Sequence, residues 1–251
     1  MKNLLSVITV VKNDEGNIEK TIKSVLSQKK YLSFEYIVLD GGSNDSTFKI
    51  IKKYENEIDY IESKRDDGMY FALNEGIKLA NGKYIGILHS GDLFTSEKIL
   101  LEYMNFIKSY EYDLIFSNLK IVSNQKTHRF YDSSFFEKKH LLMGWMPPHP
   151  TCIIKKKVIQ RINYYDTYFK ISSDFDLILK LIMKSDITFK HIPILSVFQS
   201  RGGMSDRGLL SKIIILKEII ISLKRNRLLK NPFLIIFRYF IKFREVVYKN
   251  D

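Results

Sequence analysis

The chain has 251 residues, of which 45% are hydrophobic and 27% charged, so it can build a full core, and wholesale disorder is excluded. Its formal net charge is +12, and residues 207–251, with eleven Lys and Arg against three Asp and Glu, carry +8 of it, unlike a uniformly basic nucleic-acid binder. A lone cysteine, Cys152, excludes an intramolecular disulfide and favours a reducing compartment, and no apolar stretch is long enough to cross a bilayer.

The first ninety or so residues alternate β-rich runs with amphipathic patterns. Strands are predicted over 5–11, 34–39, 58–61 and 84–88, and helices over 18–28, 45–54 and 69–80. This alternation predicts a parallel sheet with helices on both faces, in which ligands bind beyond the carboxyl ends of the strands. The loops that follow the strands begin at Lys12, Asp40, Glu62 and His89, and they are the expected binding loops.

The remainder of the chain is less regular. Strands are predicted over 113–117, over 120–122 and within 187–198, and an amphipathic helix over 175–183. Three prolines in the segment GWMPPHP exclude regular structure over 144–150. Long apolar helices begin at Leu209 and break at Asn231 and Pro232. In the last helix one face carries Arg238, Lys242, Glu245 and Lys249, and the other carries Phe233, Phe237, Phe240, Phe243 and Val247.

One predicted strand ends in a carboxylate that two glycines follow. Asp40 in VLDGGSNDST would be exposed at the ligand edge of the sheet, and Gly41 and Gly42 would let a ligand approach the backbone. Asp45 and Ser46 can cap the next helix, whose N-terminus favours an anion. The alternative is a strand, turn and helix with a capping aspartate and no ligand, and this segment alone does not decide between the two.

Two further carboxylates are candidates for chemistry. Asp92 follows a strand end and could hold Mg²⁺ or Mn²⁺ against a diphosphate, or could belong to an ordinary turn. Asp174 opens a helix and could act as a general base on a sugar hydroxyl, although an aspartate in a first turn often serves only the helix dipole. Asp176 is the competing candidate, on a different face of that helix.

Five segments in order resemble the family-2 glycosyltransferases, enzymes with the GT-A fold. They are SVITVVKND, YIVLDGGSNDST, the stretch from DDGMYF to ILHSGD, SSDFDLILKL and FQSRGGMS, and the third resembles the O-antigen, capsule and exopolysaccharide branch. The resemblance implies an α/β, Rossmann-like nucleotide-diphospho-sugar transferase with a mainly parallel central sheet. It implies a catalytic domain over 1–206, with a nucleotide-binding half over 1–92 and an acceptor-side half over 93–206. A basic amphipathic helical tail over 207–251 would follow.

The resemblance also implies roles for single residues. Asp174 becomes the catalytic base and Asp92 the metal ligand. The nucleotide-sugar would be bound by Val11, Asn13, Asp40, Gly42, Asp66, Asn74, Ser90, Gly91, Asp92 and Gly203. The family usually places Asp-x-Asp before the metal, whereas this chain has His-Ser-Gly-Asp over 89–92, with one certain carboxylate. We still expect a divalent cation, Mn²⁺ or Mg²⁺, whose shell phosphate oxygens and water would complete.

The implied reaction is inverting transfer of a sugar from a UDP-hexose or UDP-N-acetylhexosamine to a saccharide hydroxyl. The acceptor would be linked to undecaprenyl diphosphate, in bacterial surface-polysaccharide synthesis. Trp145 and His149 could contact this acceptor or be structural.

The tail would place the enzyme on the inner face of the cytoplasmic membrane, unless its helices merely pack on the catalytic domain. The rival hypotheses are a catalytically weak module that binds a nucleotide-sugar and a basic nucleic-acid-binding protein. The charge distribution and the lack of a recognition motif oppose the second, and no nucleic acid is expected as a partner.

Overall fold

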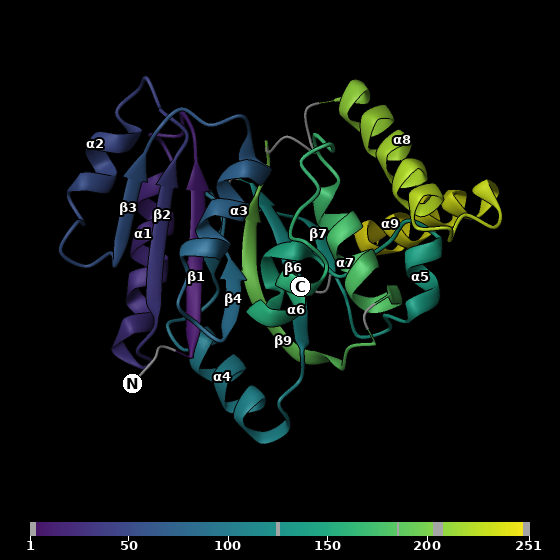
Figure 1. The fold of residues 1–251 in the computed structure, drawn as a ribbon, viewed down its shortest axis with the longest axis horizontal. Coiled ribbons are helices and arrows are strands. Elements are labelled where there is room, and N and C mark those ends of the chain that lie inside the picture. The colour runs from purple at the N-terminus through teal and green to yellow at the C-terminus, as the bar shows by residue number, and fades with distance from the viewer. Residues whose placement is uncertain (1–3, 124–125, 185, 203–207, 248–251) are drawn as a thin grey trace.

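The computed structural model describes residues 4–123, 126–184, 186–202 and 208–247, which form one α/β unit (Figure 1). Its strands are β1 (Leu5–Val11), β2 (Glu35–Asp40), β3 (Tyr60–Ser63), β4 (Tyr84–Ile87), β5 (Leu93–Phe94), β6 (Leu114–Ser123), β7 (Lys126–Tyr131), β8 (Ile153–Lys155) and β9 (Phe189–Ser200). Its α-helices are α1 (Ile18–Ser27), α2 (Thr47–Lys52), α3 (Met69–Leu79), α4 (Ile99–Tyr110), α5 (Lys138–Leu142), α6 (Lys156–Arg161), α7 (Ser173–Lys184), α8 (Leu209–Arg225) and α9 (Phe237–Val247). Short 3₁₀ helices are η1 (Gln28–Lys30), η2 (His149–Thr151) and η4 (Pro232–Ile236).

All the described strands belong to one sheet, with the order β3-β2-β1-β4-β8-β6-β9-β5 and with β7 paired to β6. Strands β1 to β4 are mutually parallel, and β6 and β9 run in the same direction as they do. Strands β5, β7 and β8 run the opposite way. The prediction of a mainly parallel sheet is therefore confirmed, and its parallel carboxyl ends share one edge.

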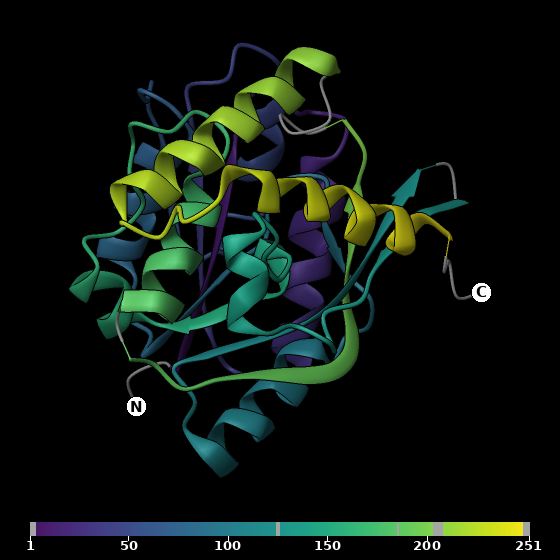
Figure 2. The same cartoon turned by 90° about the vertical axis from the view of Figure 1, so that its right-hand side faces the viewer.

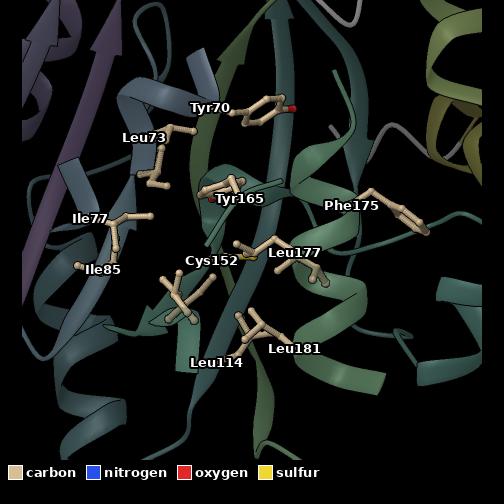
Figure 3. Packing of buried hydrophobic residues seen from close by; sticks show 14 of the residues in the cluster. Tyr70, Leu73, Ile77, Ile85, Leu114, Cys152, Tyr165, Phe175, Leu177 and Leu181 are labelled. Atoms are coloured by element: carbon tan, nitrogen blue, oxygen red, sulfur yellow. The ribbon is translucent and has the colours of Figure 1, made fainter. Parts of the chain in front are cut away.

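Two apolar layers cover the sheet, one on each face. Along β1 the side chains alternate, so that Ile8 and Val10 belong to one layer and Val7 and Val11 to the other. The first layer includes residues of α3, α7 and α8, and Figure 3 shows Leu73 and Leu177 packed within it. The second layer includes residues of α1, α2 and α4. Strands buried on both faces explain the nearly continuous apolar runs in the sequence.

Most of the predicted elements occur within a residue or two of their expected bounds, and the differences have local causes. The helix expected from residue 45 begins at Thr47, because the carboxylate of Asp45 accepts the backbone N–H of Thr47. The strand expected over 58–61 lies over 60–63. Two expected strands merge into β6, which is irregular near Asn118 and at Ile121 and Val122. Regular structure does occur within GWMPPHP, since η2 tolerates Pro150 in its first turn.

Helices α8 and α9 lie together at one end of the molecule, to the right in Figure 1 and in front in Figure 2. Gly144 packs closely beneath them, since a Cβ atom there would lie 3.1 Å from Ile219 of α8 and 3.6 Å from Ile235 of η4. Within the ranges described above, no helix is both long and apolar enough to span a membrane.

Candidate active site

A cavity of about 1380 Å³ opens at the carboxyl ends of the parallel strands. Loops after β1, β3 and β4 line one side of it, and the start of α7, the loop before η2 and parts of α8 and α9 line the other. The predicted residues that line it are Val11, Asn13, Asp66, Ser90, Gly91, Asp92, His149 and Asp174. The predicted loops after β1, β3 and β4 thus converge on one cavity, whereas no residue of the predicted loop after β2 lines it. Gly203 lies outside the described residues.

The loop after β1 is held against the loop after β2. Ser43 Oγ accepts the backbone N–H of Asn13 at 2.8 Å, and the side-chain oxygen of Asn13 accepts the backbone N–H of Asn44 at 2.8 Å. Thr47 Oγ1 similarly accepts the backbone N–H of Asp14. Asn13 has a left-handed backbone with φ of +51°, a conformation that asparagine tolerates better than most residues. These bonds fix the position of the loop after β1, which lines the cavity.

Asp40 lies behind that wall instead of in it. Its carboxylate is 2% exposed and accepts the hydroxyl of Ser63 at 2.5 Å, the hydroxyl of Ser43 and the backbone N–H of Ser43 at 3.0 Å. Gly42 does not line the cavity either and has φ of +72°, a conformation suited to glycine. In this structure the Asp-Gly-Gly turn therefore fixes the positions of the neighbouring loops. Asp66, whose carboxylate packs on Gly41, lines the cavity beside this turn.

The turn that carries Asp92 is clamped by helix α1. Thr21 Oγ1 accepts the backbone N–H of Gly91 at 2.9 Å and donates to the backbone carbonyl of Asp92 at 3.1 Å. Gly91 has φ of +92°, so the turn needs a glycine there. Ser90 donates its hydroxyl to Asp14 at 2.6 Å. The side chain of Asp92 is thus aimed by the backbone of the turn.

The carboxylate of Asp92 has few partners. It is 4% exposed, and its partners are Gln199 Nε2, at a weak 3.5 Å, and the backbone of Ser200. Burial raises the pKa of the Asp92 carboxyl to about 7. Among the described residues no three His, Cys, Asp or Glu side chains are grouped as a metal site. A divalent cation would therefore take one protein carboxylate and otherwise phosphate oxygens and water, a donor set that suits Mg²⁺ and Mn²⁺. An under-satisfied carboxylate on the cavity wall fits that role.

Asp174 lies at the start of α7, on the same cavity. Burial raises the pKa of its carboxyl to about 6, against the effects of the Phe175 N–H bond at 2.8 Å and of the Arg238 charge. The segment before it is held by Glu218 of α8, whose carboxylate accepts the backbone N–H groups of Lys170, Ile171 and Ser172. A carboxyl with a pKa near neutrality, held rigidly at a cavity, suits a general base.

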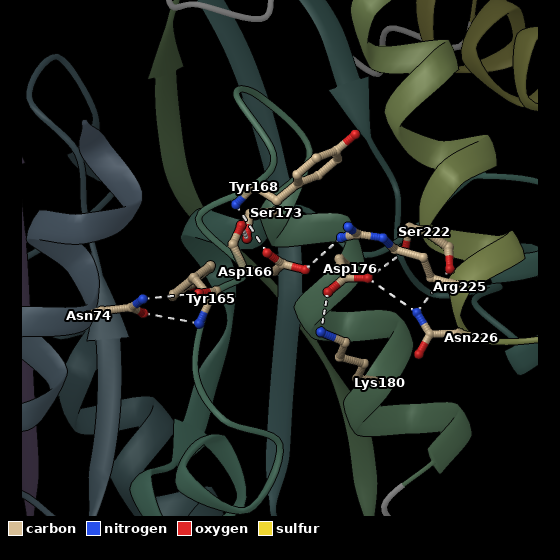
Figure 4. A network of polar contacts seen from close by, with 10 residues as sticks. All are labelled: Asn74, Tyr165, Asp166, Tyr168, Ser173, Asp176, Lys180, Ser222, Arg225 and Asn226. Atoms are coloured by element: carbon tan, nitrogen blue, oxygen red, sulfur yellow. Dashed lines mark hydrogen bonds and ion pairs between the residues drawn. The ribbon is translucent and has the colours of Figure 1, made fainter. Parts of the chain in front are cut away.

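Asp176 faces away from the cavity and has structural partners. It is 1% exposed, pairs with Lys180 at 2.6 Å, and accepts hydrogen bonds from Ser222 at 2.7 Å and Asn226 at 3.1 Å (Figure 4). These contacts join α7 to α8. Between the two candidates for the base, the geometry favours Asp174.

His149 is a buried member of the cavity wall. Its Nε2 pairs with the hydroxyl of Tyr165, and its ring stacks on His89 with centroids 6.0 Å apart. Burial lowers the pKa of His149 to about 3 and that of His89 to about 4, so both rings are neutral near pH 7. Asn74, also expected at the donor, instead exchanges two hydrogen bonds with the backbone of Tyr165 and does not line the cavity.

Trp145 does not reach the cavity, so a sugar cannot stack on it in this structure. The side chain is 1% exposed and packs among Tyr131, Phe135 and Phe136. Its indole N–H donates to Glu245 of α9 at 2.8 Å. The reason is tertiary: the buried carboxylate of Glu245, which also pairs with Arg129 of β7, needs donors, and Trp145 supplies one.

Glu245 also decides which way α9 faces. The face that carries Glu245 packs inward, so Arg238 and Lys242 line the cavity instead of the outer surface. The aromatic face points outward, with Phe233 73%, Phe240 66% and Phe243 69% exposed. The predicted separation of the polar and aromatic faces is confirmed for the described residues. Of the two alternatives for the tail, the face with Arg238 and Lys242 packs on the catalytic domain, and membrane contact of the aromatic face stays a prediction. Lys249 lies outside the residues that the structure describes, and so does the side chain of Val247.

Sequence reasoning missed Glu218, Arg129 and Lys212. Glu218 and Lys212 lie in an apolar helix that follows the recognisable motifs, and Arg129 lies in an irregular hairpin. The only local signal was that Glu218 interrupts a long apolar run. A charged residue within such a run is buried only where the fold supplies hydrogen-bond or ion-pair partners for it.

A sheet of this order, with carboxylates from the β4 loop and from α7 on one cavity, has the architecture of GT-A sugar transferases. The sequence model of the family "Glycosyl transferase family 2" matches residues 6–171, and the chain belongs to that family. An uncharacterised glycosyltransferase of Mycobacterium tuberculosis is 30% identical over 207 residues, which cover 81% of this chain and 78% of that protein. The chain is therefore a glycosyltransferase.

A second relative has a named reaction. The Escherichia coli enzyme WfgD, a UDP-Glc:α-D-GlcNAc-diphosphoundecaprenol β-1,3-glucosyltransferase, is 30% identical over 122 residues, 48% of this chain and 47% of its own length.

Solved structures share the fold. Staphylococcus aureus TarS 1–349 in complex with UDP-GlcNAc superposes with a TM-score of 0.71 at 19% identity, covering 89% of this chain and 66% of that one. The mannosyltransferase PcManGT of Pyrobaculum calidifontis, in complex with GDP-Man and Mn²⁺, has a TM-score of 0.67 at 13% identity, covering 96% and 70%.

Proposed function

We propose that this glycosyltransferase moves a hexose or N-acetylhexosamine from a UDP-sugar to a hydroxyl of a saccharide linked to undecaprenyl diphosphate, with inversion, in assembling a bacterial surface polysaccharide such as O-antigen or capsule. The observation that carries the proposal is the presence of Asp92 and Asp174 on one cavity, to which the loop after β4 and helix α7 contribute them. The relative WfgD has a donor and an acceptor of these classes in its name, and TarS holds UDP-GlcNAc on the same fold.

The proposed chemistry is a single displacement. The acceptor hydroxyl oxygen attacks the anomeric carbon while Asp174 takes its proton, and the bond from that carbon to the diphosphate oxygen breaks, the oxygen keeping the electron pair. One displacement inverts the anomeric centre, so an α-linked donor gives a β-glycoside. The raised pKa of Asp174 supports this role, because a base near neutrality accepts a proton with little loss of driving force.

On the donor side, Asp92 would hold a divalent cation together with the diphosphate of the donor. When bound, the cation supplies positive charge to the leaving diphosphate. Asn13, Asp66, Ser90 and Gly91 line the same wall and would bind the nucleotide-sugar there. The complex of PcManGT with Mn²⁺ on the same fold supports a cation of this type.

A membrane-surface location at the cytoplasmic face fits the outward aromatic face of η4 and α9. Phe237, Phe240 and Phe243 would lie at the headgroup level, where apolar burial and cations such as Arg244 contribute together. Replacing these three phenylalanines by serine in the full chain should abolish co-sedimentation with anionic vesicles and leave donor binding unchanged. Equal co-sedimentation of the variant and the intact chain would contradict this location.

The test of the reaction starts from donor binding. Thermal unfolding is measured with UDP-hexoses, UDP-N-acetylhexosamines and GDP-mannose in the presence of Mn²⁺, because a ligand at 100 times its Kd stabilises the native state by about 2.7 kcal/mol. The donor found is then incubated with saccharide alkyl diphosphates, and the anomeric configuration of the product is read by NMR. Stabilisation by a UDP-sugar and a β-linked product from an α-linked donor are expected. A product with retained configuration, or a response to GDP-mannose alone, would refute the proposal.

A further inference from the structure

One wall of the cavity carries cations that the reaction described above does not use. Arg238 and Lys242 of α9 and Lys212 of α8 line the same cavity as the loop that carries Asp92. Arg129 of β7 also lines it, but its charge is paired with Glu245. Arg238 and Lys242 form no hydrogen bond or ion pair with any residue that the structure describes.

The direction of these two side chains is imposed by the fold. Glu245 is tied to Trp145 and Arg129, about a hundred residues away in sequence, and this contact sets the rotation of α9 about its axis. Lys242 is three residues and Arg238 seven residues before Glu245, so both lie on its face of the helix. Both cations therefore face the cavity because the buried contacts of Glu245 fix the orientation of the helix that carries them.

Neither cation forms an ion pair among the described residues, although the charge of Asp174 acts on Arg238 and that of Glu245 acts on Lys242. Burial, followed by the charge of Arg238, lowers the pKa of Lys242 to about 7, and burial also lowers the pKa of Arg238. Removing cations from water is costly unless an anion is at hand. An anionic ligand that enters the cavity would supply the missing partner and restore the charge of Lys242.

The cluster belongs to the acceptor side of the cavity. The charge of Arg238 lowers the pKa of Asp174, the proposed base, whereas the pKa of Asp92 is set by burial, Gln199 and Ser200. The diphosphate of a donor would lie at Asp92. An anion held by Arg238 and Lys242 would instead lie beside the base, where the acceptor hydroxyl must be.

We infer that Arg238 and Lys242, assisted by Lys212, form a subsite for the phosphate or diphosphate group of the acceptor. This inference rests on the proposed function, because it takes the acceptor to carry such a group. The outward aromatic face of the same helix is exposed, so a lipid chain attached to that diphosphate would have an apolar surface on α9 to contact. One helix thus recognises both chemical parts of the acceptor, the anion on its inner face and the lipid on its outer face.

The test uses binding, so it does not depend on turnover or on knowing the acceptor sugar. Geranyl diphosphate is titrated by calorimetry into the full chain saturated with UDP and Mn²⁺, which fill the donor side. The double variant Arg238→Gln, Lys242→Gln should bind it at least about ten-fold more weakly than the parent chain. The matched control is Lys224→Gln, Lys230→Gln, which removes the same charge from exposed positions outside the cavity and should bind like the parent.

Several outcomes would overturn the subsite. They are no binding by the UDP-saturated parent chain, equal weakening in both double variants, and loss of UDP affinity in the Arg238 and Lys242 variant. The last would assign the cations to the donor. A fourth is loss of binding to phosphatidylglycerol vesicles in this variant while its affinity for geranyl diphosphate is unchanged, which would assign the cations to headgroups. Failure of the proposed reaction is seen separately, as the absence of any transferred sugar by a parent chain that still binds geranyl diphosphate.

Discussion

The two walls of the cavity are built in different ways. The donor-side wall consists of loops after β1, β3 and β4, which are held by the loop after β2 and by α1, as in the bonds from Asn13 to Ser43 and from Gly91 to Thr21. The acceptor-side wall consists of α7, α8 and α9, which single buried carboxylates join across long stretches of chain. The first wall is specified by turns, and the second by tertiary contacts that a single substitution can remove.

This difference has a functional consequence. Turns with positive-φ glycines and strand-end carboxylates suit a donor whose diphosphate changes little from one enzyme to another. Helices α7 and α8 pack on the apolar layer of the sheet, and their position also depends on a few buried polar contacts such as those of Glu218 and Asp176.

The largest expected effect is the loss of turnover when Asp174, the proposed base, is replaced. Asp174→Asn should lower kcat by about 10²–10⁴-fold, because it removes the base, while donor affinity stays within about two-fold. Single-turnover transfer and donor titration measure the two quantities. Asp176→Asn is the contrasting variant, and its activity per folded molecule should stay near that of the parent chain. Near-normal turnover by Asp174→Asn would move the base elsewhere.

The second prediction tests whether single carboxylates hold the acceptor-side wall. Glu218→Gln should destabilise the protein by about 2–3 kcal/mol, because an amide offers one acceptor oxygen to three backbone N–H groups and places its own N–H₂ against them. Denaturant unfolding measures the loss. Lys217→Gln, at the exposed neighbouring position, should change stability by less than about 0.5 kcal/mol. An equally stable Glu218→Gln variant would show that the wall has other supports.

The third prediction compares one glycine from each wall. Gly91→Ala adds a Cβ atom at an ordinary 3.5 Å from Ser200, so its cost, about 1–2 kcal/mol, is the strain of φ at +92°. Gly144→Ala has the same kind of strain at φ of +74° and also presses on Ile219 at 3.1 Å, so it should cost about 1 kcal/mol more. Thermal unfolding ranks the two variants. The reverse order would contradict the view that helices pack tightly over Gly144.

The fourth prediction concerns the anchor of α9. Trp145→Phe keeps the apolar ring but removes the donor to Glu245, and should cost about 1–2 kcal/mol. The acceptor KM should rise, since Arg238 and Lys242 lose their fixed direction, while the donor KM stays unchanged. Tyr131→Phe, which removes a different buried donor on the same wall, is the control for general loosening. A selective rise in the donor KM would contradict the prediction, because it would show that Trp145 supports the donor-side wall.

The smallest effect is in the pH profile. Because the proposed base must be ionised, kcat/KM should rise with pH and level off above the pKa of Asp174, about 6. Arg238 lowers that pKa, so Arg238→Gln should move the midpoint upward, by less than about one unit. The contribution of Asp174 to the free energy of unfolding changes with pH in the opposite direction. The folded-state pKa is raised above 3.8, so this group makes the protein less stable as pH rises from about 4 to about 6, and Asp174→Asn should abolish that loss. A midpoint that Arg238→Gln leaves unmoved would separate this cation from the base.

The sequence by itself determined the β1 to β4 half of the fold, the family, and Asp66 and Asp92 among the carboxylates that line the cavity. Apolar runs of period two, helical spacing and turn glycines are local properties, so they could be read in order along the chain. They also predicted helix α7 and the two faces of α9. They did not decide between Asp174 and Asp176, which differ only in what lies opposite them.

Only the tertiary structure decided which residues reach the ligand. Asp40 and Asn74 have the expected sequence context, yet both are engaged by neighbouring loops, and Trp145 is engaged by Glu245. The direction of the basic stripe of α9 was also undetermined, because an amphipathic helix can turn either face inward. The physical reason is that a buried polar group must be satisfied by whatever the fold places beside it, and that partner is distant in sequence.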